Sequence, residues 1–257
     1  MRLKLSFAFI FIIVLMLSSL KYIADHKYVI GNINQSIDQK RLQEIVDNTT
    51  AEGVVVYDVK SDKILASKNT DKKYSLASLT KIITAVFVYE NDKSLINDIR
   101  NMLKTSSNED AIRLANVFSP NIDEQIFYIN KRSEKYHLHF RNVSGLDIIL
   151  DKDDNRLAGG EGKPMDFINF MKDYYLKYPE IFDQTMVKEN NTNLSIDKMD
   201  FVGASKTGFT NLSGGNLFVN INKGLNKDIF ILVLNSTEKN RFVDVQNIAN
   251  FLLQSSI

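Results

Sequence analysis

The sequence predicts a mixed α/β (α+β) protein: a mostly antiparallel sheet built from both chain ends, flanked by helices and carrying an inserted helical lobe. Runs rich in β-branched residues occur near residues 53–68 and again between residues 203 and 236. Between about residues 90 and 180, apolar residues recur mostly at helical spacing. Strands at both ends with helices between them favour one sheet covered by helices, with a cleft between sheet and lobe.

The composition is that of an ordinary globular chain. Its 257 residues are 44% hydrophobic and 25% charged, which is enough for a sizeable core. The formal charge is only +1, so no basic field favours nucleic acid, and we expect no nucleic-acid partner. Because cysteine is absent, a disulfide framework, a thiolate nucleophile and a cysteine metal site are excluded.

The N-terminus indicates an export signal or a membrane anchor. Arg2 and Lys4 precede an uncharged, mostly apolar run at residues 5–20, which ends at Lys21. The run spans a bilayer only if Lys21 snorkels and the next two residues join it. Poor cleavage patterns favour an uncleaved anchor at residues 1–23 with its positive end inside, over a removed signal or a buried core helix. In either export reading, the rest of the chain works outside the cytoplasm.

The first strands and helices follow in order. Residues 24–50 are expected to be a linker and a first helix, which Ser36 caps. Residues 53–69 predict two strands around the polar turn at residues 60–62. Helical spacing then covers the segments at residues 78–89, 95–103, 110–118 and 124–136.

The second half returns to strands. Residues 138–146 predict a strand or extended segment entering a turn, and residues 165–178 predict a helix ended by Pro179. Three strands are expected at residues 203–210, 214–222 and 227–236, and a last helix at residues 241–254. We therefore expect one globular domain at residues 51–257, with its helical lobe at about residues 90–180.

Three short motifs carry candidate chemistry. Ser78 and Lys81 form an S-x-x-K tetrad at the start of a helix, although chance supplies the same tetrad at Ser18, Ser195 and Ser236. A serine hydroxyl needs a base within hydrogen-bond reach, and a lysine one helical turn away lies on the same face. The lysine serves as a base only if its pKa is lowered, which a helix N-terminus, burial or a second cation achieves.

The order and setting of the other motifs strengthen this hypothesis. Ser106-x-Asn108 begins the next helical stretch, and Lys206-Thr207-Gly208 lies on a predicted strand and occurs once. With these motifs the chain resembles the penicillin-recognising serine enzymes, specifically the D-alanyl-D-alanine carboxypeptidases and related endopeptidases. The resemblance extends from about Val54 to Phe251 through the blocks YSLASLTKIIT, MLKTSSNEDAIRLA, FRNVSGLD, NTN and GASKTGFTNLSGGNLF.

The resemblance implies a role for each motif residue. Ser78 is the nucleophile and Lys81 its base, while Ser106 bridges the proton path and Asn108 bonds the substrate amide. Lys206 is the second cation, and with Thr207 it holds the substrate carboxylate. The oxyanion lies between the backbone N–H groups of Ser78 and Phe209, the latter on an edge strand where Gly208 leaves room.

The implied function is a serine-type D-alanyl-D-alanine carboxypeptidase that acts on peptidoglycan stem peptides in the bacterial envelope. It needs no cofactor or metal, and β-lactam antibiotics are expected as covalent inhibitors. Two alternatives remain open: a β-lactamase, and a non-enzymatic peptidoglycan-binding protein of the same fold. The 25 positions from Lys81 to Ser106 are fewer than the family pattern implies, which leaves substrate choice open.

Three other features are weaker candidates. His26, His137 and His139 offer a base, but the alternation around the last two predicts strand packing. The acidic run from Asp151 starts like a calcium loop but lacks its glycine and final carboxylate, so a solvated loop is expected. Glu189 faintly resembles a deacylating glutamate but lies too near Lys206, so slow release of penicillin is expected.

Overall fold

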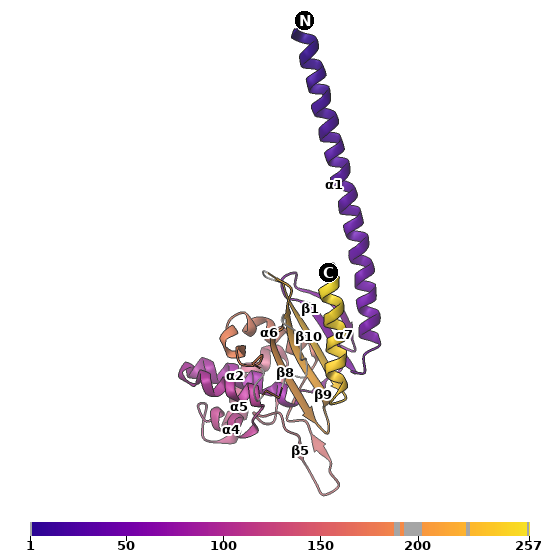
Figure 1. The fold of residues 1–257 in the computed structure, drawn as a ribbon. Coiled ribbons are helices and arrows are strands. Elements are labelled where there is room, and N and C mark those ends of the chain that lie inside the picture. The colour runs from indigo at the N-terminus through magenta and orange to yellow at the C-terminus, as the bar shows by residue number, and fades with distance from the viewer. Residues whose placement is uncertain (1, 188–190, 193–201, 225–226, 256) are drawn as a thin grey trace.

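A five-stranded antiparallel sheet forms the centre of the protein in a computed structural model (Figure 1). The structure describes residues 2–187, 191–192, 202–224, 227–255 and 257, without the side chains of residues 2–15, 26 and 28–35. The strand order is β2 (Lys63–Lys68), β1 (Gly53–Asp58), β10 (Asp228–Ser236), β9 (Gly214–Asn222) and β8 (Val202–Thr210).

The first and last strands pair directly, as Val55 lies opposite Leu232. The predicted sheet built from both chain ends is therefore confirmed. Among the described strands, β8 pairs with β9 alone and forms an edge, so one side of its backbone faces the helical lobe.

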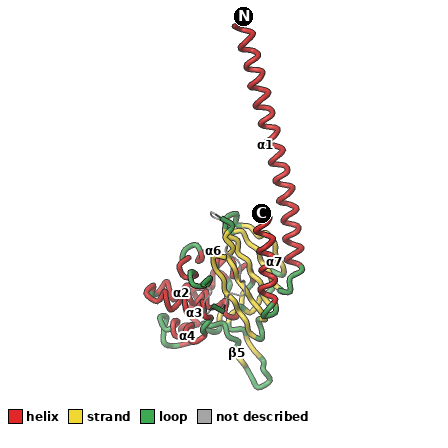
Figure 2. Tube along the Cα trace, viewed as in Figure 1, coloured by secondary structure: helices red, strands yellow, loops and turns green. Residues whose placement is uncertain are grey.

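Helices cover both faces of the sheet (Figure 2). On one face, α7 (Asn240–Gln254) and the end of α1 (Arg2–Asp47) bury Leu42, Val46 and Val245 against the strands. On the other face lie α2 (Thr80–Asn91) and α6 (Pro164–Tyr175). Two separate apolar cores thus hold the sheet, and both consist of residues from distant parts of the chain.

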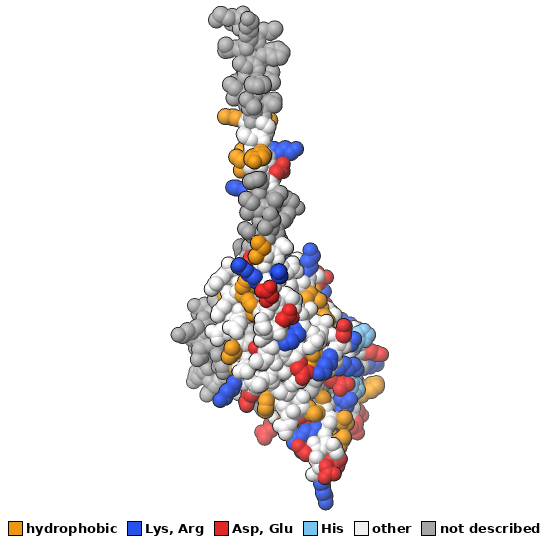
Figure 3. Space-filling view, turned by 90° about the vertical axis from the view of Figure 1, so that its right-hand side faces the viewer, with side chains coloured by type: hydrophobic (Ala, Val, Ile, Leu, Met, Phe, Trp, Pro, Cys, Tyr) orange, Lys and Arg blue, Asp and Glu red, His pale blue; other side chains and the backbone are white. Residues whose placement is uncertain are grey.

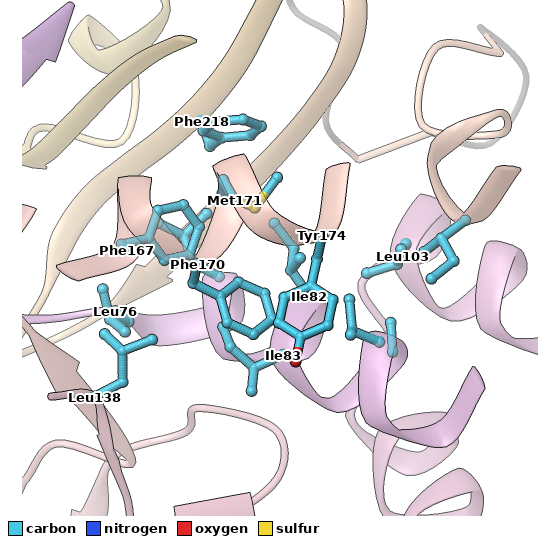
Figure 4. Close-up of a cluster of buried hydrophobic side chains, with 14 of the residues drawn as sticks. Leu76, Ile82, Ile83, Leu103, Leu138, Phe167, Phe170, Met171, Tyr174 and Phe218 are labelled. Atoms are coloured by element: carbon cyan, nitrogen blue, oxygen red, sulfur yellow. The ribbon is translucent and has the colours of Figure 1, made fainter. Parts of the chain in front are cut away.

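The aromatic side of α6 packs over α2 (Figure 4). Phe167, Phe170 and Tyr174 recur at helical spacing, and Phe170 meets Phe87 of α2 edge to face with ring centroids 5.9 Å apart. The remaining lobe helices are α3 (Ile96–Thr105), α4 (Asn108–Ala115) and α5 (Ile122–Ser133). The predicted helix at residues 165–178 ends three residues early, after Tyr175.

Short strands complete the domain: β3 (Tyr74–Ser75), β4 (His139–Phe140) and β7 (Gly160–Gly162) form one small sheet, and β5 (Ile148–Ile149) pairs with β6 (Arg156–Leu157). The extended segment expected at residues 138–146 is a strand only over β4. Beyond it, the Asn142 side chain accepts hydrogen bonds from the backbone N–H groups of Ser144 and Gly145, which folds the chain into a loop. Acidic and basic side chains are interspersed over one face of the molecule (Figure 3).

The predicted anchor and first helix are one continuous helix, α1, which extends away from the sheet (Figure 1). No proline interrupts residues 2–47, so the backbone continues without a break. Within the part of the chain that the structure describes, no helix is both long and apolar enough to cross a membrane. Much of the predicted anchor lies where side chains are not described, so anchoring stays a prediction.

Candidate active site

Ser78 lies on a 3₁₀ turn, Ala77–Leu79, that leads directly into α2. Ala77, just before it, has a positive φ of 48°, which is unfavourable for a residue with a Cβ. The chain is held there by the backbone N–H of Leu76, which donates to Gly160 O at 2.8 Å. The turn leaves Ser78 partly exposed while Leu76, Ala77 and Leu79 are buried.

Lys81 lies one turn later with its side chain fully buried. Its Nζ lies 2.7 Å from Ser78 Oγ, 2.7 Å from Asn108 Oδ1 and 2.8 Å from Ser144 O. A neutral amine has two N–H groups and one lone pair. Because the two carbonyl oxygens only accept, they take both N–H groups, and the lone pair is left to accept the proton of Ser78.

Burial lowers the pKa of Lys81 from 10.5 to about 7. Near neutral pH a large fraction of Lys81 is therefore uncharged, as a general base requires. The sequence predicted that the helix N-terminus, burial and Lys206 as a second cation could each lower this pKa. Burial is the cause of the shift at Lys81, and at Lys206 burial and then repulsion by Lys81 lower the pKa.

The second motif links two lobe helices. α3 ends at Thr105, and Ser106 adopts a left-handed conformation with φ 58°. Ser107 then caps α4 by accepting the backbone N–H of Asp110, which leaves Asn108 as the first residue of that helix. The turn thus aims Asn108 at Lys81, and the short interval from Lys81 to Ser106 still accommodates the rest of α2 and all of α3.

The third motif lies on the edge strand β8, with Lys206 buried. Lys206 Nζ donates to Ser106 Oγ at 2.8 Å and to Thr207 O at 2.9 Å. Burial, and then repulsion by Lys81 and Arg241, lowers the pKa of Lys206 well below 10.5. The structure therefore brings the three sequence motifs together. The first lies at the start of α2, the second between α3 and α4, and the third on β8.

Gly208 brings β8 close to the nucleophile. A Cβ at this position would lie 3.0 Å from Leu76 O and 3.2 Å from Ser78 N. Thr210 N–H points across the hairpin to Ser213 Oγ, so the preceding N–H, that of Phe209, faces the free edge. The N–H groups of Ser78 and Phe209 thus belong to backbone segments in contact, as the oxyanion prediction requires.

Ser144, whose carbonyl is the third partner of Lys81, was not among the predicted site residues. Its loop is held by Asn142 and by Thr84 Oγ1, which donates to Val143 O at 2.7 Å. Gly145 follows with φ 82°, and a Cβ there would lie 1.8 Å from Ala77 O. The block FRNVSGLD was a signal for this loop, but a backbone acceptor has no residue type that identifies it.

Arg241 was also missed. Its guanidinium is buried, and Nη1 donates to Gly208 O at 2.7 Å. Its Nε has no hydrogen-bond partner among the described residues, and burial lowers its pKa. A buried arginine beside Lys206 makes this end of the site an environment for an anion. The only cue in the sequence was one arginine at the start of an amphipathic helix.

The weaker candidates lie elsewhere. His137 and His139 are exposed, and the side chain of His26 and all of Glu189 lie outside the described residues. Asp151 heads the β5–β6 turn and accepts from the N–H groups of Asp153 and Asn155, so its carboxylate serves the turn. The described part of the chain holds no cluster of three or more metal-binding side chains.

The fold is similar to that of solved penicillin-binding proteins, and one segment of the chain matches a family of D-alanyl-D-alanine carboxypeptidases. The model of the D-alanyl-D-alanine carboxypeptidase family matches residues 38–105, which include Ser78 and Lys81. The resemblance inferred from the motifs is thus confirmed for that segment. No curated protein gave a significant match to the chain.

Solved structures share the fold over most of the chain. Penicillin-binding protein D2 from Listeria monocytogenes, in its ampicillin-bound form, is 20% identical with a TM-score of 0.67, covering 79% of this chain and 98% of that one. A D-alanyl-D-alanine carboxypeptidase from Mycobacterium tuberculosis is 16% identical with a TM-score of 0.65, covering 82% and 95%. Penicillin-binding protein 6B from Escherichia coli is 18% identical with a TM-score of 0.65, covering 79% and 77%.

Proposed function

We propose that the chain is a serine-type D-alanyl-D-alanine carboxypeptidase that acts on peptidoglycan stem peptides through an acyl-enzyme on Ser78. The observation that carries the proposal is the environment of Lys81. Its amine lies 2.7 Å from Ser78 Oγ, and burial brings its pKa to about 7. Among the described residues Lys81 has no carboxylate partner, and a buried lysine without one is unfavourable unless its neutral form is used.

The proposed reaction has two halves. Ser78 Oγ transfers its proton to Lys81 Nζ and attacks the carbonyl carbon of the penultimate D-alanine. The N–H groups of Ser78 and Phe209 stabilise the oxyanion. The proton then passes by way of Ser106 to the leaving nitrogen, the C–N bond breaks, and terminal D-alanine departs. Water next attacks the ester, which releases the shortened peptide as a carboxylate and returns the proton to Ser78.

Recognition follows from the remaining side chains. Lys206 and Arg241 supply positive charge at one end of the site, where Thr207 adds a hydroxyl, and this suits the terminal carboxylate of the peptide. Asn108 uses its oxygen for Lys81, so its amide N–H₂ is available for a substrate carbonyl. A β-lactam carries a carboxylate and a reactive amide in similar positions, so we propose that it acylates Ser78 as an inhibitor.

The proposal is tested with the full-length chain in mild detergent, incubated with a fluorescent penicillin and analysed by intact mass beside Ser78→Ala. We expect a stable adduct on the unaltered chain alone, and release of D-alanine from a stem pentapeptide. Release only from cross-linked peptides would make the chain an endopeptidase.

Rapid hydrolysis of nitrocefin without a stable adduct would instead indicate a β-lactamase. Peptidoglycan binding that survives Ser78→Ala, with no adduct on either chain, would indicate a binding protein.

A further inference from the structure

We infer that Asn216 is a positioning residue for the acylation of Ser78, an inference that rests on the proposed function. Asn216 lies on β9 and is fully buried. Its Nδ2 donates to Ser75 O at 2.8 Å, and its Oδ1 accepts from Asn235 N at 2.9 Å. One side chain therefore joins the segment before the nucleophile to the sheet.

The donated bond acts where the backbone is strained. Ser75 lies three residues before Ser78, and Ala77 between them has a positive φ of 48°. Such a conformation persists only where surrounding contacts hold it. Besides the pairing of β3 with β7, the segment before Ala77 receives the bond from Leu76 N to Gly160 O and the bond from Asn216 to Ser75 O.

The accepted bond connects Asn216 to the end of β10. Asn235 lies on the last part of β10, within the register shift between Val233 and Ser236, and it also has a positive φ. In the strand pairing, Asn216 lies opposite Gly208, the residue of β8 that faces Ser78 N. Asn216 thus lies opposite β8, which supplies the Phe209 N–H, and is bonded to the segment before Ser78, which supplies the other oxyanion donor.

Loss of the donated bond frees the segment before Ser78 to move relative to β8. Because the two oxyanion donors come from these two segments, a displacement separates them, and an error of ~1 Å in such a site costs ~10²-fold in rate. The pKa of Lys81 is lowered by burial, and its amine keeps its bonds to Asn108 and Ser144, so the pH midpoint of acylation should not change. The expected defect is therefore in the acylation step alone.

The test compares Asn216→Ala with Asn220→Ala in the full-length chain. Asn220 is a matched control because it is also fully buried on β9, and its Nδ2 donates to Tyr175 Oη and Asp228 Oδ1 at 2.8 Å. We measure the dissociation constant of a fluorescent penicillin, its first-order acylation rate constant and the pH profile of that rate. Asn216→Ala should lower the rate constant ~10- to 100-fold with the dissociation constant and pH midpoint unchanged.

Asn220→Ala should have an acylation rate constant within about twofold of that of the unaltered chain, even if both variants lower Tm by a similar amount. Equal rate losses in the two variants, a loss in the binding step, or a shifted pH midpoint would overturn the inference. Asn216→Leu keeps a similar side-chain volume but loses the donor to Ser75 O and the acceptor for Asn235 N, so it should be as slow as Asn216→Ala. A wild-type rate in Asn216→Leu would show that the bonds of Asn216 do not position Ser78.

Hydrogen exchange separates this inference from the proposed function. Peptides covering residues 74–79 should exchange faster in Asn216→Ala than in the unaltered chain or Asn220→Ala. If the unaltered chain forms no penicillin adduct, the proposed function fails. The exchange measurement still decides whether Asn216 holds residues 74–79. Unchanged exchange in Asn216→Ala would then reject Asn216 as the residue that holds this segment.

Discussion

At the scale of single residues, the protonation state of Lys81 is expected to set the rate of acylation. Its pKa of about 7 means that the neutral form increases as the pH rises through 7. Only the neutral form accepts the proton of Ser78, so the rate should rise with pH and be roughly tenfold higher at pH 8 than at pH 6. Stopped-flow measurement of penicillin acylation between pH 5.5 and 9 checks this.

Lys81→Arg provides the control for this prediction. A guanidinium stays protonated throughout the same pH range, so the variant should lose ~10²- to 10⁴-fold in acylation rate. A flat pH profile in the unaltered chain, or a variant that acylates at the normal rate, would contradict the role of Lys81 as base.

The residues that the sequence did and did not identify differ in how they act. Ser78 and Lys81 act through side chains at helical spacing, so residue type and position predict their contact. Ser144 acts through its backbone carbonyl, which every residue possesses. Arg241 reaches Gly208 from another element 33 positions later, and no local pattern reports such a contact.

At the scale of elements, the close approach of β8 to the nucleophile turn is expected to require Gly208. A Cβ there would lie 3.0 Å from Leu76 O and 3.1 Å from the Ala77 Cβ, tighter than ordinary packing. The Gly208→Ala variant should therefore move the strand from Ser78 and lower the acylation rate ~10- to 100-fold with little change in Tm.

Gly203→Ala is the matched control for this prediction. It adds a methyl group to the same strand, where the Cβ would meet the side-chain ends of Tyr175 and Asn220, away from the site. Its acylation rate should stay near that of the unaltered chain. Equal rates for both variants would show that the spacing between β8 and the turn is not critical.

The elements that the sequence predicted well are those with a strong repeating pattern. In the hairpin β1–β2 and in strands β9 and β10, apolar residues alternate with polar ones or form continuous runs. Once these segments are strands of one sheet, their antiparallel pairing follows. Residues 138–146 were predicted as a strand or extended segment entering a turn, and β4 lies at the start of this segment. The path of the loop that follows is set by the single amide of Asn142, which a periodicity cannot reveal.

At the scale of the whole molecule, the active site depends on two parts that fold from distant segments. Lys206 on the sheet and Ser106 on the lobe meet although they lie 100 positions apart. The sheet in turn is covered by α1, where Leu42 and Val46 are fully buried and Gln43 bonds the edge strand β2 at Ser67. The end of α1 is therefore part of the structure that supports the site.

We propose that the two ends of α1 differ in role, with an anchor at residues 1–23 and a packed end near Leu42. The full-length chain should stay in the bacterial membrane fraction in high salt and be extracted by detergent. Its intact mass should show that residues 1–23 are still present. A chain beginning at Asp25 should be soluble, with unchanged Tm and acylation rate. A chain beginning at Thr49 should unfold readily, since losing Leu42 and Val46 each removes ~1.5–3 kcal/mol of burial. Full-length protein that is soluble without detergent would reject the anchor, and a membrane-free product shortened near residue 23 would identify a cleaved signal.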